Sequence, residues 1–191
     1  MPKTDPAREA LLTALEASGV SIPLWDGILI EETVRVAPGA TILPGCILRG
    51  NTTIAAGSVI GPGSVLTDAV IGKNCIVKNT YITESTLEEN VSIGPFSQVR
   101  PGCHIAAGCK IGDFVEVKNS HIGQKTAIAH LTYVGDTDCG SGVNFGCGVA
   151  IANFNGKEKF RTTIGDGAFL GCNTNLVAPV TIGAGAYTAA G

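Results

Sequence analysis

The sequence predicts an all-β protein, a parallel β-helix of short stacked coils with a short helix at its N-terminus. The first observation is that aliphatic residues recur every six positions over most of the chain. Between them lie clusters of Gly, Pro, Asn or Ala, as in VAPGAT, ILPGCI and IAAGSV. The second is composition, because the chain has 26 glycines in 191 residues and only 5% aromatic residues. Such a chain must fill its core with layers of small and β-branched side chains, as repeat proteins do.

Residues 1–33 are predicted to form a helix and a connector that precede the repeats. Asp5-Pro6 predicts the helix start, since an acidic N-cap accepts unpaired backbone N–H groups and proline fits the first turn. Ser18-Gly19 predicts its end. One side of this helix carries three leucines, Leu11, Leu12 and Leu15. We expect this apolar side to pack against the first coil of the repeats.

Residues 34–191 are predicted to form the hexapeptide-repeat β-helix domain. Each six-residue step is a short strand and a corner, and Gly, Asn or Pro-Gly supplies the corner. Three steps make one coil, so residues about 18 apart should lie above one another, although the ladder slips by one residue in places. At about 4.8 Å per coil, the prism should be roughly 40 Å long. The expected inward positions are Val36, Ile42, Leu48, Ile54, Ile60, Leu66, Ile71, Val77, Leu87, Ile93, Val99, Ile105, Ile111, Val117, Ile122, Ile128, Val134, Cys139, Phe145, Ile151, Ile164, Leu170, Leu176 and Ile182.

One segment breaks the ladder, the polar stretch ANFNGKEKFRTT at residues 152–163. It lies between two inward positions, Ile151 and Ile164. It carries three cations, Lys157, Lys159 and Arg161. In a solenoid such an insertion must leave the prism as a protruding loop. Loops on rigid repeats commonly carry function, so we expect this one to reach a binding site; a solvated loop without a role is the alternative.

Charge and hydropathy exclude two classes of partner. The net charge of −3 argues against nucleic acid, which favours a basic face. No apolar run approaches the roughly 18 residues needed to cross a bilayer. The N-terminus MPKTDPAREALL also lacks the apolar stretch of a signal peptide. We therefore expect a soluble, cytoplasmic protein without nucleic-acid or membrane partners.

The cysteines are expected to be reduced. There are seven, an odd number, and no C-x-x-C motif points to zinc or redox chemistry. Most fall where the repeat takes a small residue, so buried thiols are the simplest interpretation.

His130 is the first candidate for chemistry, because an imidazole can take a proton from an attacking amine or hydroxyl. A hydrogen-bonded structural role is the alternative for His130 and the expected role for His104 and His121. A zinc site made of all three histidines is a further alternative. Their spacings of 17 and 9, however, do not match those of prisms that bind zinc through three histidines. We therefore expect no metal.

Arg100 and Lys118 are cations on an acidic protein. Three six-residue steps separate them, so they should lie above one another on one face. Two stacked cations repel each other, and a bound anion would relieve the repulsion. A phosphate fits such a pair best. Solvated surface charge is the alternative, and it is the expected role of Lys157.

The second half of the chain, from VRPGCHIAAGCK to LVAPVTIGAGA, carries a set of specific motifs: RPG, GDFVE-K, AHLTYVGD, the N-F-N-G-x-x-KF loop and LVAPVTIG. Together they resemble the acetyltransferase half of the bifunctional bacterial enzyme that makes UDP-N-acetylglucosamine, a hexapeptide-repeat acyltransferase. Residues 34–90 agree only as six-residue repeats. The resemblance implies a left-handed coil and a homotrimer with active sites between neighbouring subunits. It also implies direct transfer of acetyl from acetyl-CoA to the 2-amine of glucosamine-1-phosphate.

The resemblance assigns roles to individual residues. His130 corresponds to the general base, and Arg100 and Lys118 to the phosphate ligands. Further contacts to the sugar phosphate are implied for Tyr133, Asn144, Asn153 and Lys159, and Glu116 would orient the site. Acetyl-CoA contacts are implied for Cys147, Cys172 and Ala190. A backbone N–H in this last group can stabilise the oxyanion of the tetrahedral intermediate.

The sequence departs from the family in two respects. The pyrophosphorylase half, with its glycine-rich N-terminal loop, is absent, so we expect no synthesis of UDP-sugars. The family's loop Tyr is Phe154 here and its loop Asp is Asn155, which motivates an alternative: an acetyltransferase for another amino- or hydroxy-sugar. A non-catalytic β-helix assembly module is the alternative from a different class, although a purely structural prism needs none of the polar residues above.

Overall fold

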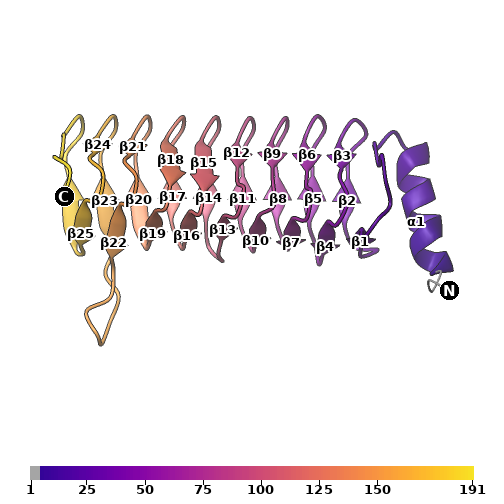
Figure 1. Ribbon diagram of the computed structural model, residues 1–191, viewed down its shortest axis with the longest axis horizontal. Helices are drawn as coiled ribbons and strands as arrows, with labels where there is room; N and C mark the ends of the chain where they lie inside the picture. Colours follow the sequence, from indigo (N-terminus) through magenta and orange to yellow (C-terminus); the bar gives the residue numbers. More distant parts are fainter. Residues whose placement is uncertain (1–4) are drawn as a thin grey trace.

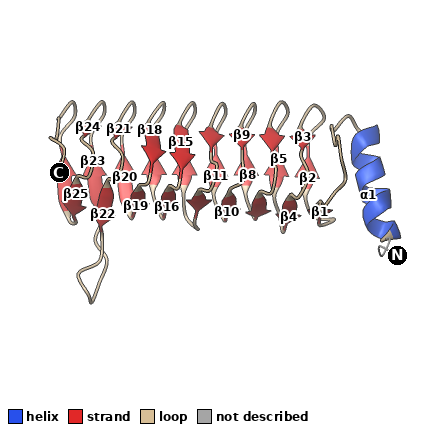
Figure 2. Ribbon diagram, viewed as in Figure 1, coloured by secondary structure: helices blue, strands red, loops and turns tan. Residues whose placement is uncertain are grey.

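The computed structural model describes residues 5–191 and shows a helix at one end of a straight prism of stacked coils (Figure 1). The strands form three parallel sheets that run along the prism (Figure 2). The predicted fold is confirmed, and the chain is a left-handed parallel β-helix. A nine-stranded sheet at about 4.8 Å per strand is roughly 40 Å long.

The three sheets take every third strand in turn. The first sheet contains β1 (Leu29–Ile30), β4 (Ile47–Arg49), β7 (Val65–Thr67), β10 (Tyr81–Thr83), β13 (Gln98–Val99), β16 (Glu116–Lys118), β19 (Tyr133–Gly135), β22 (Ala150–Ala152) and β25 (Asn175–Val177). The second contains β2 (Arg35–Val36), β5 (Thr53–Ile54), β8 (Val70–Ile71), β11 (Thr86–Leu87), β14 (His104–Ile105), β17 (His121–Ile122), β20 (Thr137–Cys139), β23 (Thr162–Ile164) and β26 (Val180–Ile182). The third contains β3 (Thr41–Ile42), β6 (Val59–Ile60), β9 (Ile76–Val77), β12 (Ser92–Ile93), β15 (Lys110–Asp113), β18 (Ala127–His130), β21 (Asn144–Phe145) and β24 (Phe169–Leu170).

The helix α1 spans Pro6–Ala17, as the start and stop signals predicted. The carboxylate of Asp5 accepts hydrogen bonds from two backbone N–H groups of the first turn, at 3.1 and 3.3 Å. Gly19, with a φ of 98°, ends the helix in the left-handed region. Leu12 is fully buried against the coils, so the helix covers the N-terminal end of the prism (Figure 1). Nowhere in residues 5–191 is there a helix both long and apolar enough to cross a membrane.

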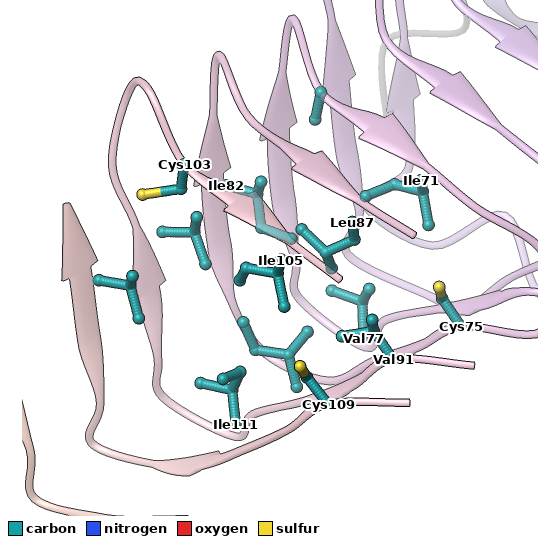
Figure 3. Packing of buried hydrophobic residues seen from close by; sticks show 14 of the residues in the cluster. Ile71, Cys75, Val77, Ile82, Leu87, Val91, Cys103, Ile105, Cys109 and Ile111 are labelled. Carbon is teal, nitrogen blue, oxygen red and sulfur yellow. The ribbon is translucent and has the colours of Figure 1, made fainter. Parts of the chain in front are cut away.

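Stacked aliphatic side chains fill the interior of the prism (Figure 3). The positions expected from the sequence are buried, except Val36 and Ile182 near the two ends, which are partly buried. Between Val36 and Ile182, the six-residue count missed one member of the ladder, Ile82, which is fully buried. It lies midway between Val77 and Leu87, so two short steps follow each other there.

Each five-residue step needs a tighter corner. At five such corners one residue with a side chain has a left-handed backbone, with φ between 44° and 51°: Asp68, Asn79, Glu84, Asn119 and Asp136. Asn and Asp tolerate this conformation better than most residues. The short steps also set the register, because each of them takes one residue out of a coil. Where Leu66 pairs with Ile82, two short steps fall in the same coil.

The repeats begin earlier than predicted. β1 already pairs with β4, with Ile30 opposite Leu48, so the coils start before residue 34. Ile30 stands one full step before Val36 and belongs to the same ladder. The segment that the sequence suggested was a connector is therefore part of the first coil.

Residues 153–161 leave the prism as a loop between β22, which still includes Ala152, and β23, which begins at Thr162 (Figure 1). The two arms meet at a bridge between Phe154 and Lys159. At the tip, the side chain of Asn155 accepts two backbone hydrogen bonds, both of 2.9 Å. Because β22 belongs to the first sheet and β23 to the second, the loop rises from the corner between these sheets.

Candidate active site

A hydrogen-bonded His–Asp pair lies at the corner between the third and first sheets. His130 ends β18, Asp113 ends β15, and the register of these strands pairs the two residues. Nδ1 of His130 lies 2.8 Å from Oδ1 of Asp113, and the side chains are 58% and 41% exposed. The hydrogen bond with His130 lowers the pKa of Asp113. The ionised carboxylate therefore keeps the proton on Nδ1 and leaves the lone pair of Nε2 for a ligand.

Sequence reasoning missed Asp113. Three full six-residue steps would place Gly112 beside His130. The step between Val117 and Ile122 is short, however, and it takes one residue out of this coil. The five-residue step is thus the signal that would have found Asp113.

The residues predicted to contact acetyl-CoA continue the column of His130 along the same corner. At each step along the column, the residue after the corner position donates its backbone N–H to the carbonyl of the equivalent corner position one coil earlier. These three hydrogen bonds, of 3.2, 2.8 and 2.8 Å, set the register. They give equivalent corner positions, in four successive coils, to His130, Cys147, Cys172 and Ala190. At about 4.8 Å per coil, an extended ligand that begins at His130 can run roughly 14 Å along this column.

A buried carboxylate organises the opposite corner, between the first and second sheets. Asp136 accepts hydrogen bonds from Nζ of Lys118 at 3.1 Å, from Nδ2 of Asn119 at 2.6 Å and from Nδ2 of Asn153. The side chain of Asp136 is 6% exposed and that of Lys118 is 17% exposed. Asp136 also occupies a short corner, with a φ of 51°. The repeat pattern carries no signal for this residue.

Burial and hydrogen bonding act in opposite directions on this pair. Burial raises the pKa of Asp136, but hydrogen bonds from Asn119, Lys118 and Asn153 outweigh it, and the net pKa is lowered. Burial lowers the pKa of Lys118, but the hydrogen bond and the charge of Asp136 outweigh it, and the net pKa is raised. Both groups are therefore charged at neutral pH, and Asp136 neutralises Lys118.

Two further cations lie near this pair. Arg100 binds Glu116 at 2.8 Å, so Glu116 orients Arg100 and not His130. Lys159 belongs to the loop and lies beside Lys118. The ammonium of Lys118 lowers the pKa of Lys159, with a smaller contribution from Arg100. Lys159 forms no ion pair with any carboxylate of residues 5–191. Three cations thus face two carboxylates, and the repulsion expected between Arg100 and Lys118 is relieved largely by the chain itself.

Tyr133 lies on β19, between the two corners. The register pairs it with Glu116, and its hydroxyl lies 3.4 Å from Nδ2 of Asn153. Gly135 makes this possible, because a Cβ there would lie 2.3 Å from the hydroxyl of Tyr133. The phenol therefore folds over the backbone of Gly135 and brings its hydroxyl beside the loop.

The structure thus gathers most of the predicted site residues on the first sheet and its two corners: Arg100, Glu116, Lys118, His130, Tyr133, Asn153 and Lys159. Asn144 is separated from them. It lies on β21 of the third sheet, where it pairs with Ala127. Within one chain, Asn144 is on a different side of the prism from the cations.

The other two histidines lie on the second sheet, where the rings of His104 and His121 stack with their centroids 4.9 Å apart. Nε2 of His104 lies 3.2 Å from Oε1 of Glu88. His130 is at a different corner, so the three histidines do not converge. In the part of the chain that the structure describes, no group of three or more His, Cys, Asp or Glu side chains is arranged to hold a metal ion.

Comparison with known proteins gives a consistent picture. The family described as bacterial transferase hexapeptide (six repeats) matches residues 84–119. The chain is 45% identical over 184 residues to the bifunctional protein GlmU of Brevibacillus brevis, and 46% identical over 184 residues to that of Acetivibrio thermocellus. Each match covers 96% of this chain and 40% of the relative, so the chain spans about two-fifths of the length of these curated relatives.

Among solved structures, the UDP-N-acetylglucosamine acyltransferase of Francisella novicida is similar with a TM-score of 0.43 and 16% sequence identity. The match covers 78% of this chain and 60% of that protein.

Proposed function

This chain is a hexapeptide-repeat protein of the family that includes the acetyltransferase part of bifunctional GlmU, and from this we propose that it acetylates the 2-amine of glucosamine-1-phosphate with acetyl-CoA. One observation carries the proposal. A single strand, β19, runs between a His–Asp pair at one corner and an excess of cations at the other. Glucosamine-1-phosphate offers an amine, which a general base can deprotonate, and a phosphate, which an excess of cations can bind.

In the proposed reaction the amine attacks the thioester carbonyl directly. As the N–C bond forms, Nε2 of His130 takes the proton of the amine. The C–S bond then breaks, and the imidazolium of His130 gives this proton to the departing thiolate of coenzyme A. The carboxylate of Asp113 accepts a hydrogen bond from Nδ1–H. It stabilises the imidazolium of His130 while the ring carries the second proton. Direct attack needs no covalent enzyme intermediate.

We place acetyl-CoA along the column of equivalent corner positions, with its thioester at His130. Cys147, Cys172 and Ala190 would follow the coenzyme away from the base. The backbone N–H groups of these corners suit an oxyanion or an amide of the ligand.

The test is acetyl transfer by the purified chain, with mass spectrometry of the sugar as the readout. We expect one N-acetylated sugar phosphate for each acetyl-CoA consumed. Consumption of acetyl-CoA without an acetylated sugar, or no reaction at all, would contradict the proposal.

Phosphate binding should depend on pH through Lys159. Its lowered pKa means that it loses its proton at a lower pH than an ordinary lysine, and only the protonated form attracts an anion. The affinity for glucosamine-1-phosphate is therefore expected to fall as the pH rises through this lowered pKa. Calorimetric titration over the alkaline range measures the effect. In Lys159→Arg the guanidinium stays charged, so the same fall should move to higher pH; an identical profile in the two proteins would contradict the role of Lys159.

We further propose a homotrimer whose neighbouring chains complete each site. Three bulky apolar residues on the His130 corner, Phe96, Phe114 and Leu131, are 57%, 56% and 60% exposed. All three have positive φ, between 48° and 58°, and the two phenyl rings stack with centroids 5.6 Å apart. Bulky residues rarely adopt this conformation, and an apolar column in water favours burial by a partner. Asn144, which lies on the other side of this corner, could then serve the site of a neighbouring copy.

The trimer can be broken at this column. We expect Phe114→Glu to give monomers in sedimentation equilibrium, because a carboxylate would be buried in the interface. Val70 is a matched control, since it is also apolar and 45% exposed but lies on the second sheet. Val70→Glu should leave the trimer intact. A monomeric wild type, or equal effects of the two substitutions, would contradict this interface.

The loop geometry bears on the alternative of another acceptor sugar. Asn155 uses its side-chain oxygen to cap the tip of the loop, and an aspartate could accept the same two hydrogen bonds. This departure therefore does not point to a different substrate. The alternative rests on Phe154, which is 57% exposed.

We also propose a cytoplasmic location. All seven cysteines are unpaired, and five are buried in the core, which suits a reducing compartment. Acetyl-CoA as the donor agrees with this location.

A further inference from the structure

Two of the seven cysteines differ from the rest. Cys147 is partly exposed and Cys172 is exposed, whereas the other five are buried. Burial raises the pKa of the buried thiols, and that of Cys139 reaches about 12, which makes them poor nucleophiles. Within one chain, an oxidant dissolved in water therefore meets Cys147 and Cys172 first.

These two cysteines occupy the same corner of adjacent coils. The backbone N–H of Asn173 donates to the carbonyl of Cys147 at 2.8 Å. The segments touch closely, because a Cβ on Gly146 would lie only 2.6 Å from the backbone nitrogen of Cys172. Equivalent positions in adjacent parallel strands are about 4.8 Å apart, and Cα atoms joined by a disulfide are about 4.4–6.8 Å apart.

We propose that Cys147 and Cys172 are a modification site, at which a low-molecular-weight disulfide converts the two thiols into one intrachain disulfide. One thiolate attacks the small disulfide and releases one small thiol. The second thiolate then attacks the mixed disulfide, forms the Cys147–Cys172 bond and releases the other small thiol. Two protein thiols and one small disulfide thus give one protein disulfide and two small thiols.

The bond also has a consequence for acetyl transfer, and this part rests on the proposed function. Cys147 lies one coil beyond His130, on the column that we assign to acetyl-CoA. The linked sulfurs would be drawn together across this column, in place of two thiols that can move apart for a ligand. Since small displacements of a bound reactant can cost about 100-fold in rate, we expect transfer to fall at least about tenfold on oxidation.

The experiment treats the full chain with oxidised glutathione and maps its peptides by mass spectrometry. We expect one peptide pair joined through Cys147 and Cys172, no change at the five buried cysteines, and full reversal by dithiothreitol. Cys147→Ser and Cys172→Ser should each remove the linked pair. A lasting mixed disulfide with glutathione, or a covalent link between two chains, would overturn the assignment.

Activity is compared in each protein before and after oxidation, so that each variant is its own reference. Wild-type transfer should fall and recover with dithiothreitol, and the ratio should stay near one in Cys147→Ser. An intact rate in the fully linked wild type would overturn the effect on transfer. His130→Ala should form the disulfide as wild type does, which separates failure of this inference from failure of the proposed function.

Discussion

Replacing His130 with alanine is expected to lower the rate of acetyl transfer by about 10²–10⁴-fold, the usual contribution of a general base. The fold should survive, because the side chain is 58% exposed and its hydrogen-bond partner is Asp113 on the same surface. Steady-state rates measure the loss, and thermal unfolding followed by circular dichroism checks the fold. Wild-type turnover in His130→Ala would remove the histidine from the mechanism.

Asp113→Asn tests how the base is held. An amide can donate to Nδ1 as well as accept from it, so the ring is no longer confined to the tautomer that presents Nε2 as a base. We expect a loss of rate that is smaller than in His130→Ala. A loss in Asp113→Asn with His130 already replaced would show that Asp113 does not act through the imidazole.

Replacing Asp136 with alanine is expected to destabilise the protein by about 3 kcal/mol, because the buried charge of Lys118 would lose its partner. It would also remove the acceptor of Asn119 and of Asn153, which anchors the base of the loop. For a chain of this size, about 3 kcal/mol lowers the melting temperature by roughly 10 °C. Differential scanning calorimetry measures the shift.

Asp138 provides the matched control. It is an aspartate two residues further on, and it pairs with Arg161, but the side chains are 54% and 44% exposed. An exposed pair contributes about 1 kcal/mol or less, so Asp138→Ala should change the melting temperature little. Equal shifts in the two variants would mean that burial of the Lys118–Asp136 pair does not matter.

The stability of the Asp136 pair should also depend on pH. The pKa of Asp136 is lower in the folded state than in the unfolded state. Its contribution to the free energy of unfolding is therefore fully present above the unfolded pKa of a carboxyl, and it is lost as the pH falls through the pKa of the folded state. The same contribution is absent in Asp136→Ala at every pH.

Much of the fold follows from the sequence because a β-helix repeats one local rule. A six-residue step predicts an inward aliphatic residue wherever it continues, from Ile42 to Leu176. The helix start at Asp5 and the loop at 152–163 carry equally local signals. Counting fails only where the steps shorten twice in succession, around Ile82.

The site was harder to predict because it depends on register between coils. A single short step moves a neighbour by one residue, and this step decides that Asp113 and not Gly112 lies beside His130. Asp136 escaped notice because its role follows from burial at a tight corner. The lowered pKa of Lys159 depends on where the loop descends, which no repeat pattern specifies.

We propose that the corner with Arg100, Lys118 and Lys159 binds the phosphate of an acceptor, and that His130 binds its amine. The most direct test compares acetyl transfer to glucosamine-1-phosphate and to glucosamine, in the wild type and in Lys159→Ala. We expect the wild type to prefer the phosphorylated sugar by about 10- to 100-fold, the contribution of a hydrogen bond to a charged group. That preference should largely disappear in Lys159→Ala. Equal rates with the two sugars in the wild type, or a preference that Lys159→Ala leaves unchanged, would contradict the claim.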